Sequence, residues 1–168
     1  MGHMKGKVKA VLCGVAVGLL VKLFALDILC VRGISMEPTL ADGQRIVVSK
    51  LAYGIVNPLS STTLASWRGP ERGDVVVFAR GGEYVVKRCV GVAGDAIELC
   101  AGAAGEAFLK VAGVSYPATD ETCELFAGIE SVPCAMIVVI GDNTDNSSDS
   151  RSWGFLAQKS VLGKVIIQ

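Results

Sequence analysis

A serine and a lysine are the residues of this sequence that could act together in nucleophilic catalysis. Ser35 stands in the stretch Ser-Met-Glu-Pro-Thr-Leu, and Lys87 stands in the apolar run Tyr84–Val90. A serine becomes a nucleophile only when a base takes its proton, and the usual base is a histidine. The one histidine, His3, lies in the extreme N-terminal tail, which argues against a Ser-His-Asp triad. A lysine held neutral in an apolar setting is the remaining common base.

Lys87 suits this role through its place in a predicted strand. Side chains at i and i±2 share one face of a strand, so Lys87 shares its face with Val85 and Cys89 while Arg88 points the other way. A base that works near neutral pH needs a lysine pKa roughly 3 units below its usual value, and burial among apolar neighbours lowers that pKa. Arg88 cannot serve because a guanidinium stays protonated. We therefore expect Cys89 to form one wall of an apolar pocket around Lys87.

Simpler interpretations of both residues stay open at this level. Ser35 precedes Glu37 and Pro38, and serine is common as a turn or cap residue in such a setting. Lys87 is by itself equally consistent with an ordinary strand lysine that faces water. Further segments of the sequence favour a catalytic role for both residues.

Four segments that contain these residues occur in a fixed order along the chain. They are Ser35–Leu40, Arg72–Phe78, Val86–Gly91 with Gly94 and Asp95, and Gly141–Arg151. Together they resemble the four sequence boxes of the bacterial type I signal peptidases. The similarity runs from the apolar N-terminal segment to the C-terminus, with a poorly matched middle near 100–135. This resemblance implies a serine endopeptidase with a Ser-Lys dyad, in which Ser35 is the nucleophile and Lys87 the general base.

The resemblance also implies supporting roles for other residues. Ser147 would orient the catalytic lysine through its hydroxyl, and Asp149 and Arg151 would form a structural ion pair. The Ser35 amide would be the first donor to the oxyanion. Many family members carry a serine as the second donor two residues before the nucleophile, where this chain has Gly33, which has no side chain to donate.

The substrate implied by the resemblance is a secretory preprotein. It would be cleaved after a small-x-small motif, typically Ala-x-Ala, at the outer face of the membrane. Ile34, Met36 and Val85 lie near Ser35 and Lys87 in the sequence and are expected to contact the substrate. Met36 is equally consistent with a contact to the membrane or with ordinary core packing. The reaction is an acyl transfer, for which we expect no cofactor and no metal.

The composition favours a mainly β protein. A length of 168 residues allows one domain with a small insert. The 20 glycines and the Val/Ile runs favour strands joined by tight turns. The resemblance implies an antiparallel β-sheet body of the signal-peptidase or LexA-like type. We expect a catalytic domain at 32–168 with a small inserted β lobe at 100–135, a loop at 54–71, and strands at 45–49, 75–78, 84–90, 96–99, 136–140 and 161–167.

The N-terminal segment at 1–31 is expected to hold a cytoplasmic tail and one transmembrane helix. Three lysines at positions 5, 7 and 9 precede an apolar run, and lysines of this kind favour the cytoplasmic side. A span from Val8 to Leu26 requires that Lys22 reaches the outer membrane interface. The body would then lie outside the cytoplasm, with membrane lipid as a partner. A cleavable signal peptide is the alternative, but Leu26–Leu29 offers no small-x-small cleavage site.

Other kinds of function find little support. A formal net charge of +0 gives no reason to expect nucleic acid as a partner. The six cysteines fit no zinc pattern; a disulfide among Cys100, Cys123 and Cys134 stays open beside the alternative of small buried side chains. The polar segment after Gly141 is a poor calcium loop, because Ser147 stands where an EF-hand needs glycine.

Two rival functions remain after the resemblance is taken into account. One is a self-cleaving repressor-type protein, which shares the Ser-Lys dyad but normally carries an N-terminal DNA-binding domain where this chain has an apolar segment. The other is a membrane-tethered β domain that only binds partners and whose dyad is inert. Gly33 keeps this second rival open, because it removes a candidate oxyanion donor.

Overall fold

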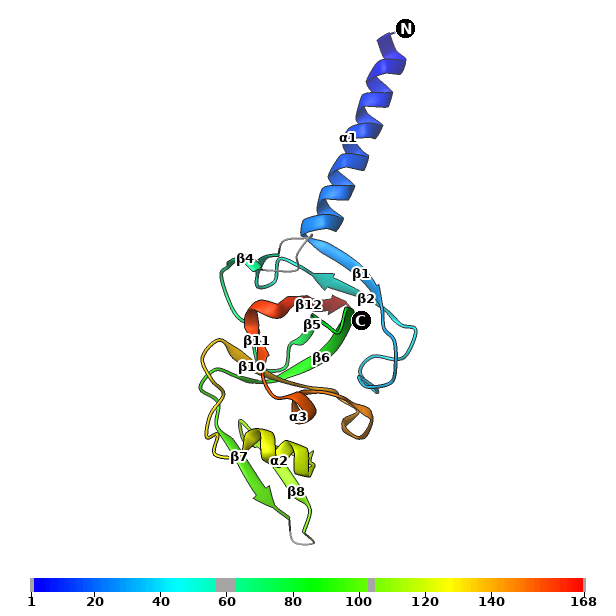
Figure 1. The fold of residues 1–168 in the computed structure, drawn as a ribbon. Coiled ribbons are helices and arrows are strands. Elements are labelled where there is room, and N and C mark those ends of the chain that lie inside the picture. The colour runs from blue at the N-terminus through cyan, green and yellow to red at the C-terminus, as the bar shows by residue number, and fades with distance from the viewer. Residues whose placement is uncertain (1, 57–62, 103–104, 168) are drawn as a thin grey trace.

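The protein consists of a β body and one long N-terminal helix (Figure 1), seen in a computed structural model that describes residues 2–56, 63–102 and 105–167. Helix α1 (Gly2–Phe24) projects away from the body, with the N-terminus at its far end. Its last turn is tied to the sheet through Lys50, whose ammonium contacts Asp27 at 2.8 Å and the Lys22 carbonyl at 3.2 Å. The helix therefore enters the body at a fixed point.

The body is built on one seven-stranded antiparallel sheet, with the strand order β1-β2-β12-β5-β6-β10-β11. Strands β5 and β10 are buried on both faces, which explains their continuous apolar runs, whereas β2 and β12 alternate between buried and partly exposed residues. The predicted mainly β antiparallel body is confirmed. The strands are β1 (Leu26–Cys30), β2 (Arg45–Ser49), β5 (Val75–Arg80), β6 (Glu83–Val92), β10 (Met136–Ile140), β11 (Leu156–Ala157) and β12 (Val161–Ile167).

A small lobe is inserted between β6 and β10. It contains a three-stranded sheet of β7 (Ile97–Ala101), β8 (Ala107–Val111) and β9 (Val114–Ala118), followed by helix α2 (Asp120–Phe126). The lobe shares a buried cluster with the main sheet, in which Leu109 and Phe126 pack with Ile140. The sequence predicts no helix here. Seven residues carry little periodic signal, and the helix depends on a cap that joins Thr119 and Thr122 in both directions.

The segment predicted as a loop at 54–71 contains a short two-stranded ribbon. Strand β3 (Gly54–Val56) pairs only with β4 (Thr63–Ser66). Such short strands leave too little alternation for detection from sequence. The turn signals at Asn57 and Pro58 lie outside the described residues.

The N-terminal segment differs from the prediction. The helix ends at Phe24, and Leu26–Cys30 pair with β2 along their whole length, so these residues belong to the sheet and not to an anchor. Among the residues that the structure describes, no helix is both long and apolar enough to cross a membrane. The predicted transmembrane helix is therefore not confirmed.

Candidate active site

Ser35 lies in the loop that joins β1 to β2. The side chains of Met36 and Leu40, which follow it, are buried in the core and anchor the loop. From the other side, the Asn143 amide donates to the Ser35 carbonyl at 3.0 Å, and the Asn143 side chain donates to the Ile34 carbonyl at 3.1 Å. The nucleophile candidate is thus held between two segments that are far apart in the sequence.

Lys87 lies in the middle of β6 and points to this serine. Its Nζ donates to Ser35 Oγ at 2.6 Å, across 52 residues of sequence. Only 4% of the lysine is exposed. The structure therefore brings together the two residues that the sequence singles out, and it buries the amine.

The electrostatic environment favours a neutral amine on Lys87. Burial lowers the pKa of Lys87, because the charged form loses its hydration. The carboxylates of Asp149 and Asp142 oppose this by raising the pKa, and Arg151 adds to the lowering. Burial prevails, so the lysine loses its proton more easily than a lysine in water.

Arg88, the next residue, points to the opposite face and joins the four boxes. Its guanidinium donates to both carboxylate oxygens of Asp142 at 2.7 and 2.6 Å, to the Gly73 carbonyl at 2.9 Å and to the Thr39 hydroxyl at 3.3 Å. Burial raises the pKa of Asp142, but the bonds from Arg88 and Thr39 outweigh it and keep that pKa low. The sequence does not predict these hydrogen bonds of Arg88, although the strand alternation places Arg88 on the face opposite to Lys87.

The predicted ion pair between Asp149 and Arg151 is present and buried. The guanidinium approaches both carboxylate oxygens at 2.9 Å, and the Gly141 amide donates to the same carboxylate at 3.1 Å. Burial raises the pKa of Asp149, yet these hydrogen bonds and those of its neighbours bring it below the usual value. The pair fixes the loop after β10 against the start of helix α3 (Ser150–Trp153).

Ser147 lies in the same loop, close to Ser35. An added Cβ at Gly141 would come within 2.2 Å of its hydroxyl and within 2.5 Å of the Ser35 carbonyl. The hydroxyl is buried and near enough to Asp149 to help lower the pKa of that carboxyl. No hydrogen bond of ordinary geometry joins it to any described group, Lys87 included.

The backbone amides of Ser35 and Gly33 differ in whether they could donate to an oxyanion. No described backbone acceptor takes the Ser35 amide, which leaves that N–H available. The Gly33 amide is occupied, because it donates to Asp42 Oδ1 at 2.8 Å. Gly33 has a φ of 85°, in the region that favours glycine, so a serine at this place would be strained although its Cβ would meet no atom. The second donor must therefore come from elsewhere than residue 33.

A groove of about 490 Å³ opens beside the serine and the lysine. Of the three predicted substrate contacts, Met36 and Val85 line it, whereas Ile34 is exposed and does not. One wall comes from β1 and the loop after it, and the other comes from the first half of β6. The lining residues are Leu29, Cys30, Val31, Arg32, Ser35, Met36, Glu83, Tyr84, Val85, Val86 and Lys87.

Both walls of this groove are strand edges without a partner. Strand β1 pairs only with β2, and the half of β6 from Glu83 to Lys87 pairs with β5 but not with β10, whose ladder begins at Arg88. In the sheet order, β1 is the first strand and β6 the fifth, so the sheet must curl to bring them to one groove. Two unpaired edges that face one groove present backbone N–H and C=O groups for an extended peptide.

Cys89 agrees with the predicted strand alternation but not with the predicted wall. Lys87 and Cys89 are both buried, as expected for one face of a strand. Cys89 packs in the core with Tyr53, Val76 and Phe78, and it does not line the groove. Burial raises the pKa of its thiol to about 12. All six cysteines are free, so the disulfide considered among Cys100, Cys123 and Cys134 is not formed.

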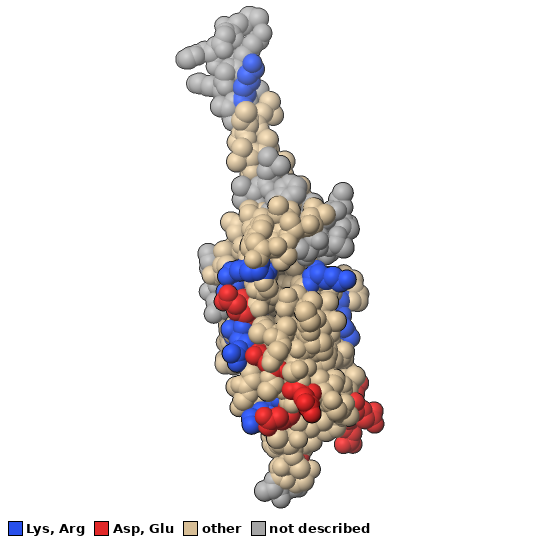
Figure 2. All heavy atoms as spheres, turned by 90° about the vertical axis from the view of Figure 1, so that its left-hand side faces the viewer, with Lys and Arg blue, Asp and Glu red and all other residues tan. Residues whose placement is uncertain are grey.

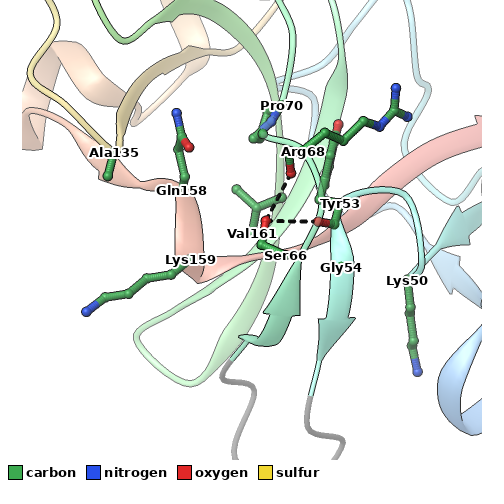
Figure 3. Close-up of a pocket in the computed structure, with 11 residues that line it drawn as sticks. Lys50, Tyr53, Gly54, Ser66, Arg68, Pro70, Ala135, Gln158, Lys159 and Val161 are labelled. Atoms are coloured by element: carbon green, nitrogen blue, oxygen red, sulfur yellow. Dashed lines mark hydrogen bonds between the residues drawn. The ribbon is translucent and has the colours of Figure 1, made fainter.

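A second hollow, of about 190 Å³, lies beside the β3–β4 ribbon (Figure 3). The Ser66 hydroxyl in its wall donates to the Tyr53 carbonyl at 3.1 Å. The charged ends of Lys50, Lys159 and Arg68 extend in different directions and do not converge on one point (Figure 3). This hollow shares no residue with the groove and holds no serine–base pair.

The chain matches the family described as "Signal peptidase, peptidase S26" over residues 4–168. A signal peptidase I of Bacillus caldolyticus is 34% identical, over 86% of this chain and 79% of that protein. A probable signal peptidase I-2 of Synechocystis is 27% identical, over 95% and 70%. A crystal structure of an Enterococcus faecalis signal peptidase I gives a TM-score of 0.42 at 28% identity, over 60% of this chain and 100% of that one.

The family match first defines the class of the protein, which is a serine peptidase and therefore a hydrolase. Because the match covers nearly the whole sequence, the chain belongs to the signal peptidase family, peptidase S26. The resemblance to the type I signal peptidases is thereby confirmed.

Gly141→Ala should reduce activity strongly without unfolding the protein. The added methyl group would meet the Ser35 carbonyl and the Ser147 hydroxyl at distances that real side chains do not adopt, so the nucleophile must move. A displacement of about 1 Å can lower kcat by about 100-fold. The control is Gly69→Ala, whose methyl group would meet only the mobile side-chain amide of Gln158. Peptide hydrolysis and thermal melting measure the two effects; full activity of Gly141→Ala would show that the loop adjusts freely.

Val85→Asp should move the activity profile to higher pH. Val85 lies two residues before Lys87 on the same strand, so a carboxylate there stabilises the charged lysine and raises its pKa. Since activity requires the neutral amine, the rising limb of kcat/KM should shift up by about one pH unit. Val85→Asn has the same shape without the charge and should leave the limb in place. An equal shift in both variants would assign the effect to packing.

Proposed function

We propose that this protein removes signal peptides from secretory preproteins, with Ser35 as the nucleophile and Lys87 as the general base. One observation carries the proposal: the buried Lys87 amine lies 2.6 Å from the Ser35 hydroxyl. A serine beside a base of lowered pKa can open an acyl transfer without a histidine. The relatives named signal peptidase I supply the reaction class and the substrate class.

The reaction follows from these two side chains. The neutral Lys87 amine takes the hydroxyl proton as Ser35 Oγ attacks the carbonyl carbon of the scissile bond. The resulting lysine ammonium gives this proton to the departing amine, which leaves an ester on Ser35. Water then attacks the ester, Lys87 takes a proton from that water and returns it to Ser35 Oγ, and the carboxylic acid product leaves.

The surrounding groups support this chemistry. The Ser35 amide is the first donor to the oxyanion, since it has no described backbone acceptor. Ser147 orients the Lys87 amine through its hydroxyl; this hydroxyl is buried and makes no hydrogen bond of ordinary geometry to a described group, which leaves it available for that role. Asp149 and Arg151 hold the loop that carries Ser147.

The groove fits a substrate bound as an extended strand. A peptide between β1 and the first half of β6 would complete the backbone hydrogen bonds of both edges. Alternate side chains of an extended strand face the same side. A small-x-small motif repeats with this period of two, so both small residues would face the wall that holds Met36 and Val86. We therefore propose cleavage after Ala-x-Ala or a related motif.

The N-terminal helix attaches the enzyme to a membrane in this proposal. Directly below α1, the face shown in Figure 2 is free of charged side chains. Exposed apolar residues lie at this end of the body, among them Leu26 and Ile28 on β1, and Leu64 and Trp67 on and beside β4. Such a surface favours a lipid environment over water. The body would lie outside the cytoplasm and the lysine-rich tail inside it.

Replacement of the two catalytic residues should be non-additive. Ser35→Ala and Lys87→Ala should each abolish turnover of a signal-peptide substrate, because neither residue works without the other. The double variant should lose little more than either single one. Hydrolysis of a peptide that carries Ala-x-Ala, assayed in detergent with the full chain, measures these losses. Near-native activity of Lys87→Ala, or losses that add, would contradict the dyad; an inactive native chain would favour an inert binding domain.

The membrane topology has a direct test in cells. A tag at residue 168 should be removed when protease is added to spheroplasts, and a tag before residue 1 should be protected, because the N-terminal lysines keep that end inside. Both tags should become accessible after detergent lysis. Protection of both tags in intact spheroplasts would refute the orientation, and a soluble protein without its first residues would show that the segment is a cleaved signal peptide.

A further inference from the structure

The groove ends at an acidic side chain. Glu83 is the first residue of β6 and lines the groove, four residues before Lys87. Four residues of strand span about 13 Å. Because side chains alternate, Glu83 lies on the same face as Lys87 and Val85. The groove thus carries a lysine amine at its catalytic end and a carboxylate about 13 Å away.

This carboxylate has no ion-pair partner among the residues that the structure describes. The nearest candidate by register is Arg80, which pairs with Glu83 across the β5–β6 turn. The Arg80 guanidinium instead lies over the ring of Trp153, 4.3 Å from its centroid. The cation Arg32 also lines the groove, but it belongs to the loop of Ser35 at the catalytic end. The carboxylate of Glu83 is therefore available to a group of the substrate that occupies this end of the groove.

The position of a substrate residue that would meet Glu83 follows from strand geometry. The recognised small-x-small motif lies before the scissile bond, so the groove to one side of the dyad holds the upstream residues. Each residue of an extended peptide lies opposite one residue of β6. If the residue directly after the scissile bond lies opposite Lys87, the four residues before the bond lie opposite the four residues of β6 that precede Lys87. The fourth of these peptide residues then lies opposite Glu83. Directly opposite side chains of neighbouring strands share a face and interact.

We propose that Glu83 is a specificity determinant that favours a lysine or arginine four residues before the scissile bond and disfavours an acidic residue there. This inference rests on the proposed function. It concerns only the choice among substrates, since Glu83 is too far from the Ser35 hydroxyl to take part in the chemistry. An exposed ion pair changes kcat/KM by about two- to fivefold, and the preference weakens with added salt.

A peptide series tests the preference. Three Ala-x-Ala peptides that differ only in Lys, Gln or Glu at the fourth position before the bond are cleaved by the full chain in detergent, at low and high salt. The native enzyme should cleave them in the order Lys, Gln, Glu, with the difference mainly in KM. Glu83→Gln should remove the order and Glu83→Lys should reverse it. Glu124→Gln, an exposed acidic residue of the inserted lobe, should keep the native order.

The outcomes separate this inference from the proposed function. Equal cleavage of the three peptides by the native enzyme, or an unchanged order in Glu83→Lys, would overturn the role of Glu83 and leave the peptidase intact. A preference that appears only when the charge is moved to another upstream position would likewise overturn the assigned register. No cleavage of any peptide by the native enzyme would overturn the proposed function itself.

Discussion

The burial of one lysine amine against one serine hydroxyl is the constraint on which this structure depends. A lysine amine in water is charged and cannot take a proton. A lysine that acts as a base must therefore be shielded from water by the strands and loops around it. Lys87 is buried in the middle of β6, which pairs with β5 along one edge and, from Arg88 onward, with β10 along the other. The rest of the body serves to place the loop of Ser35 over that amine.

Two arginine–aspartate pairs, Arg88 with Asp142 and Arg151 with Asp149, hold the loops around the lysine in place. Arg88 ties Asp142 to the Ser35 loop and to the turn before β5, and Arg151 fixes the Ser147 loop through Asp149. Both pairs also bring negative charge near Lys87, which by itself would raise its pKa. Desolvation outweighs these carboxylates, so the pKa of Lys87 is lowered in spite of them. In the proposed mechanism, the same ion pairs that hold the loops in place therefore act against the neutral amine that the reaction needs.

The sequence revealed the parts of the fold and site that leave a local pattern. Val and Ile runs predict the long strands, and the lack of a second histidine points to Ser35 and Lys87. It did not reveal the β3–β4 ribbon or α2, which are too short to show a period, nor the edge strand Leu26–Cys30, whose apolar residues read as a continuation of the helix. Cys89 was placed on the correct face, but only the packing of three strands shows that it contacts the core and not the groove. The sequence identifies Arg88 only as an unsuitable base, because its three hydrogen-bond partners, Asp142, Gly73 and Thr39, come from distant segments.

The unpaired edge of β6 between Glu83 and Lys87 has a consequence for turnover. Main-chain hydrogen bonds to a substrate do not depend on the substrate's side chains, so an enzyme that binds in this way can accept many unrelated preproteins. It can discriminate among them only at the few positions where substrate side chains contact the walls of the groove. The same groups hold the cleaved fragment as well as the intact chain, because hydrolysis of one bond leaves the upstream strand unchanged. In the proposed mechanism, release of that fragment therefore competes with binding of the next substrate, and product release becomes a step that can limit turnover.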